Sequence, residues 1–201
     1  MTKIVLAFDD EDEYMGDFNR GCLEDFNEFL NDRGHNVITI QSAQLNDLNI
    51  QYKTNGEVPF LFAAYSHGFK TSLNSASGAY ISTTTNNTCF NQALFYTVSC
   101  HAATELGPCL IENGCPSFFG YKSPFNFWAG YKCFSQCANH GFFLFLQGTE
   151  TNKVYQEMIK EYNNQIDVLY EENSFIASLL VDNRKALVYK GQNVTIDNFA
   201  H

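Results

Sequence analysis

The chain has 201 residues, of which 45% are hydrophobic and 15% aromatic, so it holds enough apolar material for one sizeable core. A formal net charge of −10 argues against a basic nucleic-acid-binding surface and against an anionic membrane partner. It is compatible with cationic substrates. We expect a single domain over residues 1–201.

The cysteines and the N-terminal residues indicate a compartment. Seven cysteines are an odd number, and the chain is too long for a small disulfide scaffold. The first apolar run is too short for a signal peptide and is followed at once by acids. No segment approaches the ~18 apolar residues of a membrane span. We therefore expect a cytoplasmic protein with reduced cysteines and no membrane partner.

Short apolar runs alternate with segments of helical periodicity, which predicts a parallel sheet with helices on both faces. The expected main strands are residues 3–8, 36–41, 59–66, 93–98 and 115–121. The expected helices are residues 16–33, 102–113, 127–147 and 151–171, with a weaker helix or turn at 46–52.

The remaining segments are less regular. Residues 71–87 are rich in Ser, Thr, Asn and Gly, and within them residues 79–82 are expected to form a hairpin strand. Residues 174–181 fit a helix or a strand. Residues 185–189 and 193–196 flank a Gly-Gln pair and predict a terminal hairpin.

Two of the apolar runs end at a reactive side chain. Phe-Leu-Phe-Ala-Ala-Tyr-Ser leads to His67, and Phe-Tyr-Thr-Val-Ser leads to Cys100. If the two runs are neighbouring parallel strands, their carboxyl ends share the edge where open α/β sheets place their sites, about 5 Å apart. A thiol and an imidazole so placed form a nucleophile with its proton-transfer partner, which predicts a cysteine peptidase.

The neighbours of these two residues fit the same chemistry. Cys100 is expected between a strand and the first turn of a helix, where the dipole favours a thiolate and the backbone N–H can hold an oxyanion. Gly68 has no Cβ, so its backbone can approach a substrate carbonyl and supply a second donor. Taken singly, Cys100 also fits an ordinary buried cysteine, and His67 an ordinary histidine in a turn. The combination of the two favours an active site.

The blocks Tyr-Ser-His-Gly, ending at Gly68, and Ser-Cys-His-Ala, around Cys100, resemble the His-Gly and Ser-Cys-His pair of the caspase-like cysteine peptidases. This group holds caspases, metacaspases, gingipains, legumain and separase. The resemblance implies a caspase/hemoglobinase-like three-layer sandwich, with a mostly parallel central sheet of about six strands flanked by helices. It also implies His67 and Cys100 as a catalytic dyad that needs no cofactor and no metal.

The order of the downstream elements resembles the bacterial gingipain and separase-related branch, which implies a bacterial member. A protein substrate is implied, and so is a partner protein that decides when the enzyme acts, as in bacterial defence or cell-death systems. The sequence departs from the family in three places. The caspase block Gln-Ala-Cys-x-Gly is absent, Val98 replaces the metacaspase acid two residues before the cysteine, and the spacing of the dyad is shorter than in caspases.

The charges near the expected site predict which substrate residue is preferred before the cleaved bond. None of the three arginines falls at the expected site, whereas Asp9 and Asp10 follow the first strand at the same sheet edge. An aspartate there would pair with a substrate Arg or Lys. An equally good alternative is a solvated acidic loop ahead of a helix. The spacing of the acids matches no EF-hand Ca²⁺ loop.

Other side chains are candidates for substrate contact or for the core. Ser99 and His101 flank the predicted nucleophile, and Trp128 is expected to wall the substrate groove, with a core position as its alternative. Cys133, Cys137 and His140 share one helical face, which suits a metal but suits an ordinary buried stripe better.

Two rival functions stay open. One is a catalytically silent caspase-like module that binds or regulates a partner. The other uses the same dyad on an amide or acyl group that is not a peptide.

Overall fold

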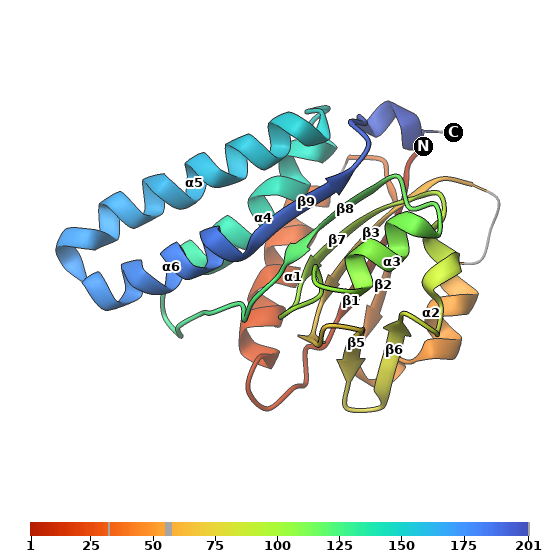
Figure 1. Ribbon diagram of the computed structural model, residues 1–201, viewed down its shortest axis with the longest axis horizontal. Helices are drawn as coiled ribbons and strands as arrows, with labels where there is room; N and C mark the ends of the chain where they lie inside the picture. Colours follow the sequence, from red (N-terminus) through yellow and green to blue (C-terminus); the bar gives the residue numbers. More distant parts are fainter. Residues whose placement is uncertain (32, 55–57, 201) are drawn as a thin grey trace.

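The computed structural model describes residues 1–31, 33–54 and 58–200 and shows an α/β protein built on a six-stranded sheet (Figure 1). The strand order is β2-β1-β3-β7-β8-β9. These strands are β1 (Lys3–Phe8), β2 (Asn36–Gln41), β3 (Phe60–Tyr65), β7 (Ala93–Val98), β8 (Ser117–Tyr121) and β9 (Leu187–Gly191). The first five run parallel, and β9 pairs antiparallel with β8. The predicted fold class is therefore confirmed.

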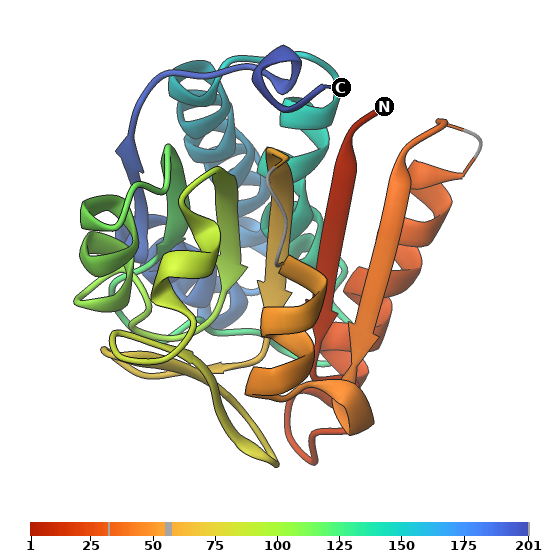
Figure 2. The same cartoon turned by 90° about the vertical axis from the view of Figure 1, so that its right-hand side faces the viewer.

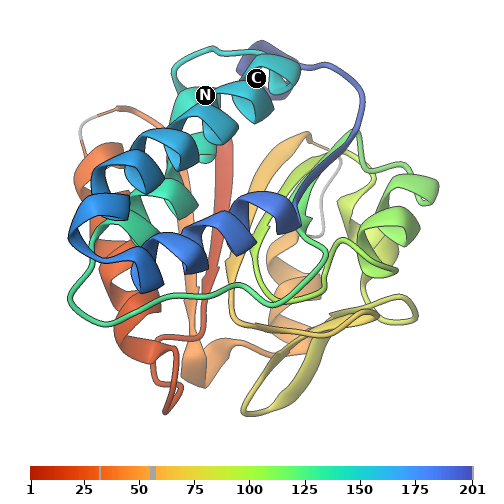
Figure 3. The same ribbon diagram turned by 60° about the vertical axis from the view of Figure 1, so that its left-hand side comes forward.

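Helices cover both faces of this sheet, as the views from its two sides show (Figures 2 and 3). The helices on one face are α1 (Gly16–Leu30), α4 (Cys133–Leu146), α5 (Thr151–Glu172) and α6 (Ser174–Ala186). The helices on the other face are α2 (Asp47–Thr54) and α3 (Leu106–Glu112). Short 3₁₀ turns are η1 (Ser42–Gln44), η2 (Asn87–Phe90) and η3 (Ile196–Phe199). The molecule thus has three layers.

Strands β3 and β7 lie at the centre of the sheet, and all their residues are buried. Each is a continuous apolar run apart from one threonine in β7, which is what a parallel strand covered on both faces requires. Successive side chains enter opposite cores: Leu61 and Tyr65 face α1 and α4, whereas Phe62 faces α2 and α3. Burial on both faces fixes the register of these two strands, and with it the place where each ends.

A second, three-stranded antiparallel sheet continues from the carboxyl end of β3. It consists of β4 (His67–Gly68), β5 (Ser72–Ser75) and β6 (Gly78–Ser82). The hairpin strand predicted at residues 79–82 is therefore confirmed. Leu73, Tyr80 and Ile81 bury this small sheet against the α2 and α3 side of the core.

Two predicted helices begin later than expected. Helix α3 begins at Leu106, because Pro108 has no N–H and its ring clashes with the carbonyl four residues earlier, so it must lie in the first turn. Helix α4 begins at Cys133, after a loop in which Gly130 adopts a left-handed φ of 86°. The ambiguous segment 174–181 belongs to α6, which begins where the Asn173 side chain accepts the N–H of Ile176.

The predicted terminal hairpin is wrong. Lys185 still belongs to α6, and the strand that follows it, β9, pairs with β8. Residues 193–196 form no strand, because Asn193 and Val194 bond with the start of α5. Near the termini, Thr2 and Ala200 form a β-bridge, and the two chain ends lie close together (Figure 1).

All seven cysteines are free thiols. No helix in the described part of the chain is long and apolar enough to cross a membrane.

Candidate active site

The two predicted dyad residues leave the main sheet from adjacent strands. Strands β3 and β7 pair in parallel, and Tyr65 at the end of one lies opposite Val98 at the end of the other. His67 and Cys100 each follow this pair by two residues. The predicted adjacency of the two strands is therefore confirmed, and the in-register pairing brings both residues to the same edge of the sheet.

Gly68 lies directly against the backbone of Cys100. A Cβ built on Gly68 would be 2.8 Å from the Cys100 nitrogen, 2.8 Å from the Cβ of Ser99, and closer still to the Cys100 carbonyl oxygen. No other amino acid fits without moving one of these segments, and two of the three contacts are with backbone. The glycine thus permits a close approach of two backbone segments. The approach of Gly68 to a substrate carbonyl stays a prediction.

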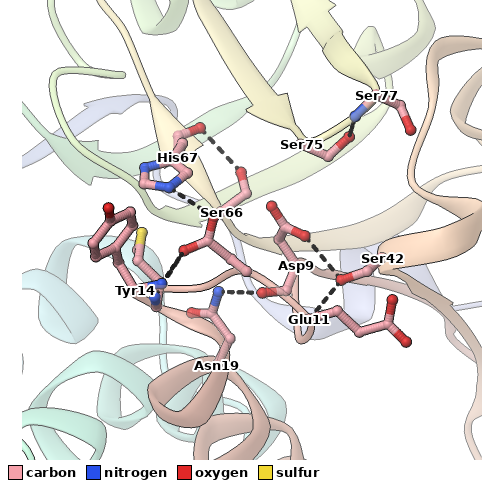
Figure 4. Close-up of polar contacts among 11 residues, drawn as sticks. Asp9, Glu11, Tyr14, Asn19, Ser42, Ser66, His67, Ser75 and Ser77 are labelled. Carbon is pink, nitrogen blue, oxygen red and sulfur yellow. Dashed lines mark hydrogen bonds and ion pairs between the residues drawn. The ribbon is translucent and has the colours of Figure 1, made fainter.

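The imidazole of His67 is bound by an aspartate that the sequence analysis did not single out. Asp12 Oδ2 lies 2.9 Å from His67 Nε2, while Asp12 Oδ1 accepts the backbone N–H groups of Tyr14 and Met15 just before α1 (Figure 4). Because Nε2 is engaged, Nδ1 is the ring nitrogen left for proton transfer. The available signal was the run of acids that follows the first strand, at the edge of the sheet where the site is expected.

The environment of Asp12 favours its charged form. Burial alone would raise the pKa of this carboxyl, but the N–H groups of Met15 and Tyr14 and the neighbouring His67 outweigh it and lower the pKa below its ordinary value. Its side chain is only 16% exposed. Asp12 is therefore a fixed anion beside the imidazole.

Cys100 lies in a turn before α3 and not in the first turn of that helix. The expected helix-dipole effect on its thiol is therefore wrong, since α3 begins at Leu106. The turn contains a non-glycine residue with a positive φ, His101 at 59°. Residues held in this region cost free energy and are concentrated at functional sites. The thiol itself accepts the backbone N–H of Phe125 at 3.3 Å.

Asp9 and Asp10, the two aspartates predicted for the specificity pocket, differ in their hydrogen bonds. Asp9 is 2% exposed; its Oδ1 accepts the Ser42 hydroxyl at 2.8 Å, and its Oδ2 is buried without a hydrogen-bond partner among the described residues. Asp10 binds Gln41 Nε2 through one oxygen and the backbone N–H of Ser42 through the other. Burial raises the pKa of Asp9, and the nearby carboxylate of Asp12 adds to this effect.

The other predicted contact residues lie in different surroundings. Ser99 is fully buried beneath Gly68, and its hydroxyl accepts that of Thr97 at 2.9 Å. His101 is half-buried, and its backbone N–H donates to the Ser123 carbonyl. Trp128 is 52% exposed, and its ring contacts Phe175 at the beginning of α6.

The helical Cys-Cys-His face is a core stripe, as the sequence favoured. Cys133 and Cys137 are buried in the apolar cluster under α4, and burial raises the pKa of both thiols. No group of three or more His, Cys, Asp or Glu side chains in the described residues is placed to hold a metal ion. His140 instead lines a cavity of about 560 Å³ between α1, α4 and α5, together with Asp25, Glu28 and Glu161. None of the dyad residues lines that cavity.

The comparisons with known proteins agree with this architecture. Neither a protein-family model nor a curated protein matches the sequence. Among solved structures, the chain is similar to the Saccharomyces cerevisiae separase-securin complex, with a TM-score of 0.64 at 12% identity. The match covers 96% of this chain and 12% of that chain, so it spans a small part of that larger protein. The chain therefore has the caspase-like α/β fold.

Proposed function

We propose that this chain is a cysteine endopeptidase in which His67 and Cys100 form the catalytic dyad. The observation that carries the proposal is the in-register pairing of β3 with β7, which brings both residues to one edge of the sheet. The close approach of Gly68 to the Cys100 backbone and the bond between Asp12 and His67 add to it. The likeness of the fold to separase supports a peptidase-type scaffold.

In this proposal the Cys100 thiolate attacks the carbonyl carbon of the scissile peptide bond. The negative charge moves to the carbonyl oxygen, where the backbone N–H groups of Gly68 and Cys100 stabilise it. The C–N bond then breaks, the leaving amine takes a proton from His67, and a thioester forms on Cys100. Water, deprotonated by His67, hydrolyses the thioester and restores the thiol.

Asp12 has a supporting part in this chemistry. Its carboxylate holds Nε2 of His67 and stabilises the imidazolium that exists before the leaving amine is protonated. Among the described residues no hydrogen bond joins the His67 ring to the Cys100 thiol. In resting enzymes such bonds are often long or absent until substrate binds.

The preference for Arg or Lys before the cut rests, in our proposal, on Asp9 alone. Its Oδ2 is a buried anionic oxygen without a partner, which a substrate guanidinium or ammonium would pair with. Both oxygens of Asp10 already accept hydrogen bonds, and Ser99 is buried, so we assign neither a substrate contact. His101 and Trp128 stay candidates for the groove wall. The solved neighbour is a complex of two proteins, which supports a protein substrate or partner here.

The test is intact-protein and peptide mass spectrometry after treatment with a peptidyl-Arg acyloxymethylketone. We expect one adduct, on Cys100, that is lost in Cys100→Ala and strongly reduced in His67→Ala. Cys89→Ala is the matched control, because Cys89 is also a half-buried free thiol and lies outside the site. An adduct from an Asp-directed probe alone would keep the peptidase and overturn the role of Asp9. Labelling spread over several cysteines, or none, would contradict the peptidase.

A further inference from the structure

Asn183, on α6, is fully buried, and its side-chain amide binds the loop that contacts the Cys100 thiol. Its Oδ1 accepts the backbone N–H of Asn126 at 2.7 Å, and its Nδ2 donates to the backbone carbonyl of the same residue at 2.6 Å. One buried amide thus satisfies both backbone groups of one loop residue. Such a pair of bonds fixes the position and the orientation of that residue.

The residue before Asn126 is Phe125, whose backbone N–H donates to Cys100 Sγ at 3.3 Å. The Phe125 ring is 5% exposed and packs against the rings of Tyr121 and Phe18, so this residue has little freedom to turn. The Phe125 N–H belongs to the peptide group that precedes the Phe125–Asn126 peptide bond. The fixed Asn126 backbone on one side and the packed Phe125 ring therefore together restrict the direction of this N–H.

The beginning of the same loop is fixed from both sides. The Lys122 N–H donates to the Ala186 carbonyl at the end of α6, at 2.8 Å, and the His101 N–H donates to the Ser123 carbonyl at 3.3 Å. The loop over residues 122–126 therefore bridges α6 and the turn that carries Cys100. The hydrogen bonds of this loop thus connect helix α6 with the Cys100 thiol.

The buried face of α6 gives no packing reason for an asparagine. Its other buried members are apolar: Ile176, Ala177, Leu180 and Ala186. An apolar side chain would fill this position without the cost of removing an amide from water. The amide is explained by the backbone groups that it binds.

We propose that Asn183 is a positioning residue for Cys100, which holds the Phe125 N–H against Sγ so that this N–H stabilises the thiolate. The inference rests on the proposed function, because it takes Cys100 as the nucleophile. A hydrogen bond from an N–H to an anionic sulfur is charge-assisted and stronger than the same bond to a neutral thiol. A donor held in this place therefore favours the reactive form of the cysteine.

The experiment measures the alkylation of Cys100 by iodoacetamide as a function of pH, with the modified site identified by peptide mass spectrometry. In Asn183→Ala we expect Cys100 to react about tenfold more slowly on the acidic limb of the profile, and the profile to move to higher pH. Asn183→Leu removes the same two bonds and fills the space, so it gives the same result if the alanine variant does not fold.

Two controls separate positioning from general loosening. Asn126→Ala keeps the backbone groups that Asn183 binds, so its alkylation profile should match that of the unchanged protein. Asn139→Ala removes another buried amide, on α4, which binds the Tyr65 hydroxyl at 2.7 Å and the Cys22 carbonyl. It should lower the melting temperature with no shift of the profile.

An unchanged profile in both Asn183 variants would overturn the inference, and so would an equal shift in Asn139→Ala. The readout needs no peptide substrate, so its failure differs from that of the proposed function. A shifted profile without any peptidase activity would contradict the peptidase and keep the role of Asn183. An active peptidase whose Asn183 variants show an unshifted profile would support the peptidase and contradict the role of Asn183.

Discussion

Asp12 and His67 are 55 residues apart in the chain, yet the Asp12 carboxylate bonds to the imidazole at 2.9 Å. The same carboxylate accepts, through its other oxygen, the backbone N–H groups of Tyr14 and Met15, the two residues before α1. One side chain therefore fixes the turn before α1 and orients the proposed general acid and base. These two roles can be separated, because an amide can replace the carboxylate as a hydrogen-bond acceptor but not as an anion.

Asp12→Asn should keep the bonds to Tyr14 and Met15 and lose the charge beside His67. We expect the free energy of unfolding to fall at neutral pH, because the folded state favours the ionised carboxylate, and kcat/KM to fall about tenfold to a hundredfold. Asp12→Ala loses both functions and should cost an additional ~1 kcal/mol of stability. Urea unfolding and peptide-cleavage rates measure the two effects.

Asp17→Asn is the matched control for the loss of charge, since Asp17 is an exposed acid in the first turn of α1 that pairs with Arg20. Its cleavage rate should stay within about twofold of the starting protein. An Asp12→Asn enzyme with full activity would show that His67 needs no orienting anion.

Gly68→Ala should abolish most activity, because the new Cβ would meet the backbone of Cys100 at 2.8 Å or less. Either β4 or the Cys100 turn must move, so we expect a loss of about 1–3 kcal/mol in stability. The cleavage rate should fall at least a hundredfold, the effect that the loss of one oxyanion donor has in other enzymes.

Gly21→Ala is the control for the added methyl group. Gly21 lies inside α1, and nothing lies within 4 Å of the position its Cβ would take. This variant should gain about 0.5–1 kcal/mol of stability, since alanine favours helices, and should cleave at the normal rate. Retained activity in Gly68→Ala would contradict the proposed oxyanion site.

Asp9→Asn should stabilise the protein and weaken cleavage after Arg or Lys. Burial raises the pKa of Asp9 above its ordinary value of 3.8, so the ionised carboxyl disfavours the folded state. This penalty is absent below the unfolded-state pKa, grows as the pH rises from the unfolded-state to the folded-state pKa, and is complete above the folded-state pKa. We therefore expect a Tm increase of about 2–4 °C at neutral pH, and none near pH 3.

Asp10→Asn should act in the opposite direction. Burial alone would raise the pKa of Asp10, but hydrogen bonds from Ser42 and Gln41 outweigh it and lower the pKa. Its ionised form therefore stabilises the fold at neutral pH, and this contribution is lost as the pH falls through the folded-state pKa. The measurement is the thermal unfolding of Asp9→Asn and Asp10→Asn between about pH 3 and neutral pH. Equal shifts of the same sign would contradict the different surroundings of the two carboxyls.

The sequence was sufficient to predict the strands that carry the dyad. Residues 93–98 form a strand with the predicted bounds, and β3 falls within residues 59–66, because each is a continuous apolar run bounded by polar residues. The pairing of β3 with β7 was a condition of the argument from sequence, and the structure meets it. Consecutive strands are often but not always neighbours: β1 lies between β2 and β3.

What the sequence did not predict depends on contacts between distant residues. Asp12 bonds to His67, and the Asn183 side chain bonds to the Asn126 backbone. Each bond joins segments far apart in the chain, so no local sequence pattern predicts it. The final strand was misassigned for the same reason, because β9 is stabilised by its partner β8 and not by an adjacent turn. The position of α3, by contrast, had a local signal, which is Pro108.

The left-handed φ of His101 gives the last prediction, because it separates the strain in the Cys100 turn from the role of the side chain. A non-glycine residue at a φ of 59° costs about 1 kcal/mol, and asparagine tolerates this conformation better than most residues do. Stability should therefore follow the order His101→Gly and His101→Asn above the unchanged protein, with His101→Val lowest. If His101 only borders the groove, the glycine and asparagine variants keep cleavage within about threefold; a larger loss with a raised KM would mean that the imidazole contacts the substrate.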